Sequence, residues 1–451
     1  MKKLKKSQFL QISIMLFGLF FGAGNLIFPP ILGNQAGSQS LIALLGFSIT
    51  AVFFPILGAI AVGQTEGLSN LSNRVGGVFA IVFTTAIYLS IGPGLGIPRA
   101  GSVPFEMAIA PYIPQNFNLS LARLLYTAVF FSVALWICLT PHKLVSRVGK
   151  YLTPILLLLI LIMFFKVVFL PPIIHEPVGE FKKGPLVQGF LSGYDTMDAV
   201  AGLNFGFVVA MSIKNFGIKE KSQITKYTIK SGVLAGTVLF IVYAMLTSIG
   251  MLTSGMFKNA ENGVVILTNS VNMVFGKFGV VLLAAIFTLA CLTTCVGLIT
   301  SGGEYFHTLF KKKLSYKTWV IIWTLFSFIM ANFGLNKLLA FSVPLLTIIY
   351  PVSLVLIIMG ITDDYLKYNK STYVITSSIA VILPLIYTMY KFFKIDLGIL
   401  SKIESTLPLA DKGLSWLLPS LIALILLTLI KNIFKNENSY WKEKKLAFNT
   451  K

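Results

Sequence analysis

The chain has 451 residues, of which 56% are hydrophobic and only 12% are charged. A soluble fold of this length could not bury so much apolar surface, so the composition excludes a soluble enzyme, a disordered chain and a secreted disulfide scaffold. The formal net charge of +21 then has to be judged by where the basic residues lie relative to the apolar segments.

Twelve segments are apolar over about 20 residues, the length that an α-helix needs to cross a bilayer. In chain order they are residues 8–32, 40–63, 77–97, 121–140, 149–171, 187–213, 228–251, 278–303, 317–335, 338–360, 372–392 and 414–434. Apolar residues occur all round these segments, whereas a β-barrel would show short alternating strands. We therefore predict an all-α membrane protein of about twelve transmembrane helices.

The basic residues set the predicted orientation. With the N-terminus in the cytoplasm, about two thirds of the 37 Lys and Arg residues fall in cytoplasmic segments, as the positive-inside rule requires. An even number of spans then places both termini inside. The positive charge is thereby explained by topology, and no nucleic-acid partner is expected.

The first apolar segment is interrupted at its middle. Gly18, Gly22, Gly24 and Asn25 lie there, and a Pro pair follows at residues 29–30. Close helix packing through small residues is the alternative explanation for the glycines. However, an Asn at that depth needs partners, so we predict a break in the first helix.

The sixth apolar segment is interrupted by Ser192-Gly-Tyr-Asp-Thr-Met-Asp198. A carboxylate at the bilayer centre costs at least about 2.5–3.5 kcal/mol, so an embedded one is usually functional. The alternative is that Asp195 and Asp198 begin a solvated helix at the outer surface. A third interruption, Gly92-Pro-Gly94, indicates a break in the third segment.

Five spans separate the first break from the break in the sixth segment, which is the pattern of a five-helix unit used twice with inverted topology. We predict a first repeat over residues 1–171 and a second over 172–360, with an outer connection at 252–277 that could form a lid. Two further helices and a basic tail would occupy 361–451.

An unwound helix offers free N–H groups at one end and free carbonyls at the other, so it can hold both charges of a zwitterionic amino acid. No Lys or Arg is adjacent to either break in the sequence, so we expect a site nearly free of basic charge and no anionic substrate. The predicted substrate-binding residues are Gly22, Ala23, Gly24, Asn25, Tyr88, Ser192, Gly193, Tyr194, Asp195 and Met197.

Other polar residues give weaker signals. Cys138, Cys291 and Cys295 lie in apolar segments and are expected to be small buried residues. Asp363 and Asp364 form a possible metal pair in a short cytoplasmic loop, but no third ligand accompanies them. A membrane enzyme is therefore not predicted, and no cofactor or obligate protein partner is expected.

Several of these motifs resemble one known family. Gly22-Ala-Gly-Asn-Leu-Ile-Phe-Pro-Pro30 resembles the opening signature of the branched-chain amino acid:cation symporters, the BrnQ-type carriers. Gly92-Pro-Gly94, Pro98-Arg99, Val103-Pro-Phe-Glu106, Gly193–Asp198, Ala290-Cys-Leu-Thr-Thr294, Ser342-Val-Pro344, Tyr350-Pro351 and Pro408-Leu-Ala410 agree as well. The resemblance implies uptake of leucine, isoleucine and valine across the bacterial cytoplasmic membrane, driven by Na⁺ or, in some members, by H⁺.

The resemblance also implies a LeuT-like fold and a sodium site between the first and eighth spans. Its ligands would be the carbonyls of Gly18, Phe21 and Ala290 and the hydroxyls of Thr293 and Thr294. These hydroxyls could instead bond back to their own helix. A second sodium site at Asn25 stays open, because the spacing from Asn25 to Pro29 is one residue shorter than in LeuT-type carriers.

These expectations combine into symport by alternating access, in which spans 1, 2, 6 and 7 rock against the rest. The nearest alternative is a transporter of the same fold for another amino acid or a nucleobase. An ion channel is disfavoured, because it would need a symmetric pore.

Overall fold

The computed structural model describes residues 3–114, 116–333, 335–431 and 433, and every regular element in this part is helical. The basic tail predicted beyond residue 433 and the side chains of residues 334–342, including Ser342, lie outside what is described. The α-helices are α1 (Lys6–Phe20), α2 (Ala23–Ala36), α3 (Ser40–Ser48), α4 (Phe54–Thr65), α5 (Leu68–Asn73), α6 (Gly77–Leu89), α7 (Gly96–Ala108), α8 (Leu119–Cys138), α9 (Thr153–Val167), α10 (Pro185–Tyr194), α11 (Asp198–Asn215), α12 (Lys221–Leu252), α13 (Gly263–Phe275), α14 (Lys277–Leu309), α15 (Tyr316–Ala331), α16 (Leu335–Leu366), α17 (Lys370–Lys391) and α18 (Ile399–Thr406). Leu417–Lys431 is a further apolar helix.

Short 3₁₀ or π segments join these helices. They are η1 (Gly37–Gln39), η2 (Ile49–Phe53), η3 (Ser90–Gly94), η4 (Ala110–Tyr112), η5 (Pro141–Lys143), η6 (Val145–Leu152), η7 (Gly179–Lys182) and η8 (Ala410–Lys412). Among them, η3 contains the interruption predicted in the third segment, since Gly92 there has the non-helical ψ of −122°.

Among the described residues, eight helical runs are long and apolar enough to cross a membrane, and the bent pair of α10 and α11 makes a ninth. This confirms an all-α polytopic membrane protein, whereas the count of twelve spans stays a prediction. The difference of three comes from length, because α1 has 15 residues, α15 has 16 and the helix Leu417–Lys431 is also shorter than the about 20 residues that a full crossing takes.

The residues divide into two compact units, Met1–Leu68 with Thr85–Ser342 and Ser69–Thr84 with Val343–Lys451. In the first unit, one bundle is made by α1 to α4 together with α10, α11 and α12. Helix α10 packs along α3, α11 along α4, and α12 along both α1 and α2. These elements correspond to the predicted spans 1, 2, 6 and 7.

A second group in the same unit is made by α7, α8, α14 and α15, which pack on one another. Glycines permit the closest approach within it. A Cβ on Gly92 would lie 2.3 Å from the indole ring of Trp323, and one on Gly302 would lie 2.2 Å from it. The Trp323 side chain thus fills the space that these two glycines leave, beside the interruption in η3.

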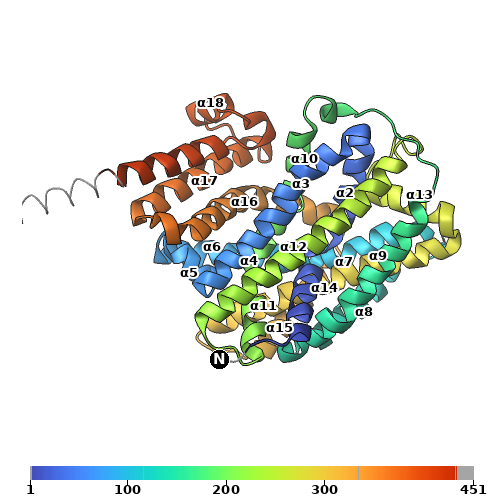
Figure 1. Ribbon diagram of the computed structural model, residues 1–451, viewed down its shortest axis with the longest axis horizontal. Coiled ribbons are helices and arrows are strands. Elements are labelled where there is room, and N and C mark those ends of the chain that lie inside the picture. Colours follow the sequence, from blue (N-terminus) through green and yellow to red (C-terminus); the bar gives the residue numbers. More distant parts are fainter. Residues whose placement is uncertain (1–2, 115, 334, 432, 434–451) are drawn as a thin grey trace, which may run out of the picture. The chain divides into compact units, whose positions relative to one another are not determined.

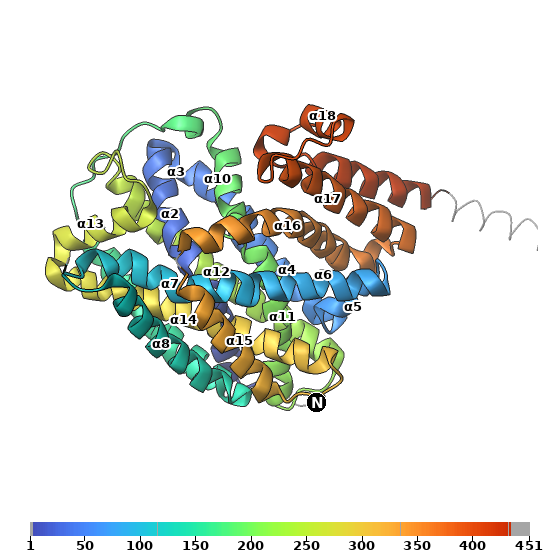
Figure 2. The ribbon, with the colours of Figure 1, turned by 180° about the vertical axis from the view of Figure 1, so that it is seen from behind.

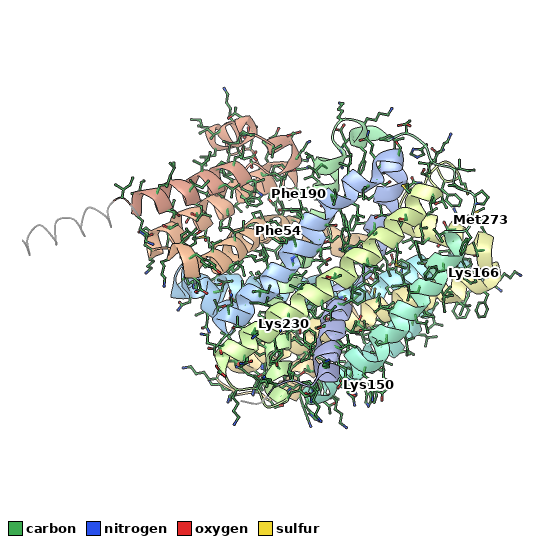
Figure 3. All side chains as sticks on the ribbon, in the orientation of Figure 1. Phe54, Lys150, Lys166, Phe190, Lys230 and Met273 are labelled. Carbon is green, nitrogen blue, oxygen red and sulfur yellow. The ribbon has the colours of Figure 1, made fainter. Side chains whose placement is uncertain are left out.

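In the first unit, residues that the predicted orientation assigns to opposite sides of the membrane lie apart. Lys150 and Lys230, both assigned to the cytoplasmic side, lie toward one end in Figure 3, and Lys166 and Met273 lie toward the other. The predicted outer connection 252–277 contains α13. This helix packs on α2 so closely that a Cβ on Gly263 would lie 1.9 Å from the carbonyl oxygen of Ile27.

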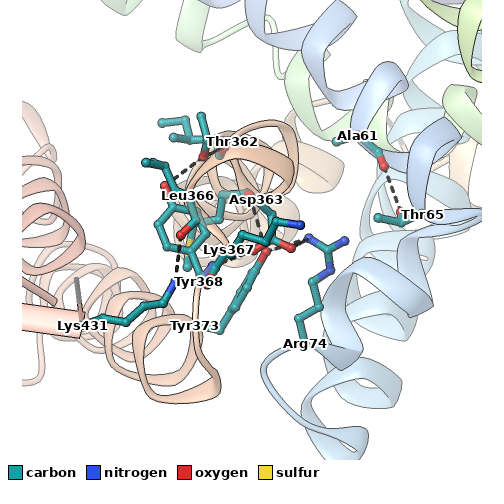
Figure 4. A network of polar contacts seen from close by, with 12 residues as sticks. Ala61, Thr65, Arg74, Thr362, Asp363, Leu366, Lys367, Tyr368, Tyr373 and Lys431 are labelled. Atoms are coloured by element: carbon teal, nitrogen blue, oxygen red, sulfur yellow. Dashed lines mark hydrogen bonds and ion pairs between the residues drawn. The ribbon is translucent and has the colours of Figure 1, made fainter. Parts of the chain in front are cut away.

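The second unit is held by a polar network at the end of α16 (Figure 4). Arg74 Nη1 lies 2.9 Å from Asp363 Oδ2 and donates to the Tyr373 hydroxyl at 2.8 Å. The Tyr368 N–H also donates to Asp363, at 3.0 Å. The prediction of a loop here is wrong, because Asp363 and Asp364 belong to the last turn of α16, and Asp363 is an ion-pair partner.

Candidate functional site

The first break lies between α1 and α2. Helix α1 ends at Phe20, and Gly22 is extended, with φ −113° and ψ −158°. In a continuous helix the Gly22 N–H would donate to the Gly18 carbonyl, but here it donates to Asn25 Oδ1 at 2.9 Å. The Asn25 side chain therefore caps α2 and stabilises the break that the glycines permit.

The second break lies between α10 and α11, whose axes bend by 50°. Met197 adopts the left-handed conformation, with φ 63°, just before α11 begins. The Thr196 hydroxyl donates to the Gly193 carbonyl at 2.8 Å and accepts from the Asp198 N–H at 3.4 Å. The two interrupted helices predicted from the sequence are thus present.

A buried hydrogen-bond network joins the two breaks. The Asn25 amide donates to Asp198 Oδ2 and to the Tyr243 hydroxyl, and this hydroxyl donates to Asp198 Oδ2 at 3.3 Å. All three side chains are at most 5% exposed. The burial of Asp198 rules out the alternative of a solvated helix start for this residue, whereas Asp195 is exposed.

The third interruption brings a basic residue to the same place. Arg99 lies in the first turn of α7, directly after η3, and its Nη2 is 3.4 Å from the position that a Cβ on Gly24 would take. The expectation of a site nearly free of basic charge is therefore wrong. It considered only residues adjacent in sequence, and Arg99 reaches the first break from another helix.

The predicted sodium ligands converge only in part. A Cβ on Gly22 would lie 3.0 Å from Thr294 Oγ1, and this hydroxyl is buried with no hydrogen-bond partner among the described residues. The Thr293 hydroxyl donates to the Ala290 carbonyl at 2.9 Å, so the back-bonding considered from the sequence is present at this residue.

The other two predicted sodium ligands, Gly18 and Phe21, lie at the end of the first span. Beside Gly18 lies Thr153 of α9, whose Oγ1 would be 2.2 Å from a Gly18 Cβ and is buried without a hydrogen-bond partner in the part of the chain described. Phe21, the other predicted ligand of this helix, stacks on Phe17 and on Tyr243.

The predicted substrate residues fall into two sets. Gly22, Ala23, Gly24, Asn25, Ser192, Gly193, Tyr194, Asp195 and Met197 lie at or next to the two breaks. Tyr88 does not, because its ring stacks on Tyr305 with centroids 4.4 Å apart. Tyr305 follows Thr294 along α14 by about 16 Å, given a rise of about 1.5 Å per residue.

Three residues of this region were absent from the predicted site. Asp198 was noted as a carboxylate at membrane depth, and its sequence position beside the break was the available signal. Arg99 follows the Gly92-Pro-Gly94 interruption, and this position was a sequence signal that could have identified it as a site residue. Tyr243 lies in the uniformly apolar segment 228–251, where no local pattern distinguishes it.

Comparisons with known proteins find one family along nearly the whole chain. The family described as "Branched-chain amino acid transport protein" matches residues 5–434. The "Branched-chain amino acid transport system 2 carrier protein" of Pseudomonas aeruginosa is 41% identical over 428 residues, which cover 94% of this chain and 96% of that protein.

Two solved structures share the fold. MhsT in complex with L-phenylalanine is 16% identical, with a TM-score of 0.53, and the match covers 93% of this chain and 98% of MhsT. Mhp1, a nucleobase-cation-symport-1 family transporter with bromovinylhydantoin bound, is 14% identical, with a TM-score of 0.55 over 95% of this chain and 93% of Mhp1. At such identities the likeness establishes the fold alone, and it confirms the predicted LeuT-like class.

Proposed function

Because this chain belongs to the family of branched-chain amino acid transport proteins, it is a transporter and not an enzyme, and we propose that it imports leucine, isoleucine and valine by Na⁺-coupled symport. The observation that carries the proposal is the meeting of two interrupted helices through Asn25 and Asp198 within a chain of this family. The location proposed is the bacterial cytoplasmic membrane with both termini inside, which the distribution of lysines supports.

In this proposal the amino acid binds where the helices are interrupted. The N-terminal end of α2 carries about half a positive charge and attracts the carboxylate, while unpaired carbonyls at the end of α1 attract the ammonium. The substrate contacts would come from the break residues Gly22, Ala23, Gly24, Asn25, Ser192, Gly193, Tyr194, Asp195 and Met197. A methylene in an apolar pocket discriminates by only about 1–3 kcal/mol, so recognition of all three substrates is expected.

Na⁺ would bind beside the first break, between the carbonyls of Gly18 and Phe21 and the α14 residues Ala290, Thr293 and Thr294. An oxygen-only ligand set suits a hard cation. Two observations support this placement. Thr294 Oγ1 and Thr153 Oγ1 are buried next to α1 without hydrogen-bond partners in the described chain, and the Thr293 hydroxyl keeps its lone pairs after donating its proton.

The double variant Thr293→Ala, Thr294→Ala tests the sodium site. It is expected to raise the Na⁺ concentration for half-maximal leucine uptake by about tenfold, because two hydroxyl ligands of a hard cation are lost. Thr288→Ala on the same helix is the control, since the Thr288 hydroxyl is 2.9 Å from the Tyr126 hydroxyl and is not one of the proposed sodium ligands. Sodium dependence that is the same in both variants contradicts the assignment.

Alternating access would use the two packed groups of the first unit. The bundle of α1 to α4 with α10 to α12 would rock against the group of α7, α8, α14 and α15. The proposed sites lie where α1, α2 and α11 contact α14 and where α2 contacts α7. Moving one net charge through 100 mV supplies about 2.3 kcal/mol, which corresponds to about a 50-fold substrate gradient.

Purified protein in liposomes, with labelled leucine and with Na⁺ and pH gradients imposed separately, tests the function. Uptake that an inward Na⁺ gradient drives and that excess isoleucine or valine competes away is the expected result. Uptake that only a pH gradient drives would indicate H⁺ coupling. Competition by another amino acid or a nucleobase, with none by the three branched-chain amino acids, would contradict the substrate assignment.

A further inference from the structure

The guanidinium of Arg99 lies at the first break and has no hydrogen-bond partner among the residues that the structure describes. Its backbone is fixed by the bond from the Arg99 N–H to the Leu95 carbonyl, 2.8 Å long, in the turn that follows η3. Its Nη2 lies beside Gly24, 3.4 Å from the position that a Cβ on this residue would take. Throughout the described residues, no acceptor lies within hydrogen-bond distance of the guanidinium, and no carboxylate lies within ion-pair distance.

The other three arginines of the chain are all paired. Arg74 lies 2.9 Å from Asp363 Oδ2, and Arg123 lies 3.5 Å from Glu106 Oε1. Arg147 donates to the carbonyls of Trp136 and Ile137 and to the Thr140 hydroxyl, at 2.7–3.2 Å. Arg99 therefore differs from every other guanidinium in the protein, although it lies in an apolar membrane segment where an unpaired charge is costly.

Two positive features meet at this point. The N-terminal end of α2 carries a partial positive charge from its helix dipole, and the guanidinium adds a full one beside Gly24. Asp195 and Asp198 attract Arg99 at longer range, but Asp198 Oδ2 already accepts from Asn25 and Tyr243. The planar fork of a guanidinium matches the two acceptor oxygens of a carboxylate, so these two positive features together favour a carboxylate ligand.

We propose that Arg99 binds the α-carboxylate of the transported amino acid, together with the N-terminal end of α2. This inference rests on the proposed function, because it assumes an amino acid at the breaks. It makes Arg99 the residue that distinguishes an amino acid from an amine of the same apolar shape.

Ligand-induced thermal stabilisation of purified protein tests the proposal, since each ligand's affinity follows from the shift in melting temperature. The ligands are leucine and leucinol, which has the same side chain and ammonium but no carboxylate. We expect the wild-type protein to prefer leucine by about 10- to 100-fold, the range for a charge-assisted bidentate contact. In Arg99→Gln, leucine affinity should fall to that of leucinol, while Arg99→Lys should retain part of the preference.

Arg123→Gln is the matched control, because it removes a guanidinium on α8 whose partner is Glu106. This control should keep the preference for leucine over leucinol, whatever its melting temperature without ligand. An Arg99→Gln protein that keeps the preference, or that loses affinity for both ligands equally, overturns the inference and leaves the proposed function standing. A wild-type protein that no branched-chain amino acid stabilises overturns both.

Discussion

Asp198→Leu is expected to reduce leucine uptake by at least about tenfold and to lower the melting temperature. The substitution leaves the Asn25 amide and the Tyr243 hydroxyl without their shared acceptor. A buried donor that loses its partner costs about 1–3 kcal/mol. Because Asn25 also caps α2 through its Oδ1, the loss should reach both interrupted helices. Initial uptake rates and thermal unfolding measure the two effects.

Asp198→Asn separates the charge of this residue from its hydrogen bonds. An amide oxygen can still accept from Asn25 and Tyr243, so the melting temperature should stay closer to that of the wild-type protein. If Asp198→Leu transports at the wild-type rate, the network is dispensable for function. Asn25→Leu and the double variant complete a cycle in which we expect strong non-additivity, since the two residues share one hydrogen bond.

Gly24→Leu is expected to abolish leucine binding while the protein still folds. A Cβ at this position would lie 3.4 Å from Arg99 Nη2 and 3.6 Å from Phe28 Cε2, which is close to ordinary contact. The three heavy atoms nearest to this Cβ all belong to the side chains of Arg99 and Phe28, which the remaining carbons of a leucine side chain would have to displace. Binding of labelled leucine in detergent, with size-exclusion elution as the measure of folding, tests this expectation.

Two glycine variants bracket the Gly24→Leu result. Gly24→Ala should weaken leucine binding only a few-fold, because the added methyl group fits with a small shift of Arg99. Gly33→Ala should instead impair folding, because its Cβ would lie 2.0 Å from the carbonyl oxygen of Thr247 on the packed helix α12. Leucine affinity preserved in Gly24→Leu would show that the substrate does not bind at the first break.

The helix breaks could be predicted because their causes are local. Glycines and an Asn within an apolar segment weaken the helix wherever they occur, and the capping bond of Asn25 joins residues only three positions apart. The same holds for Gly92 in η3. Family membership could be predicted for a related reason, since these interruptions are short motifs that can be read without any knowledge of the packing.

The partners across the breaks could not be predicted in this way. Tyr243 lies 218 residues from Asn25 in the sequence, in a predominantly apolar segment. Without an amphipathic pattern, no periodicity indicates which face of α12 is turned toward the site. The same limitation explains Tyr88, which is one of the predicted substrate-binding residues but stacks on Tyr305 in the structure.

The sequence by itself determined the membrane class, the helical fold, the family and the positions of the interruptions, because hydropathy and backbone propensity are local properties. Only the tertiary structure decided which polar groups meet at those interruptions. It brought Asp198 and Tyr243 to Asn25 and placed Arg99 beside Gly24. The physical reason is that these contacts depend on how each helix packs and how it is rotated about its own axis. The sequence of a helix that is apolar all round does not indicate which of its faces is turned toward the site.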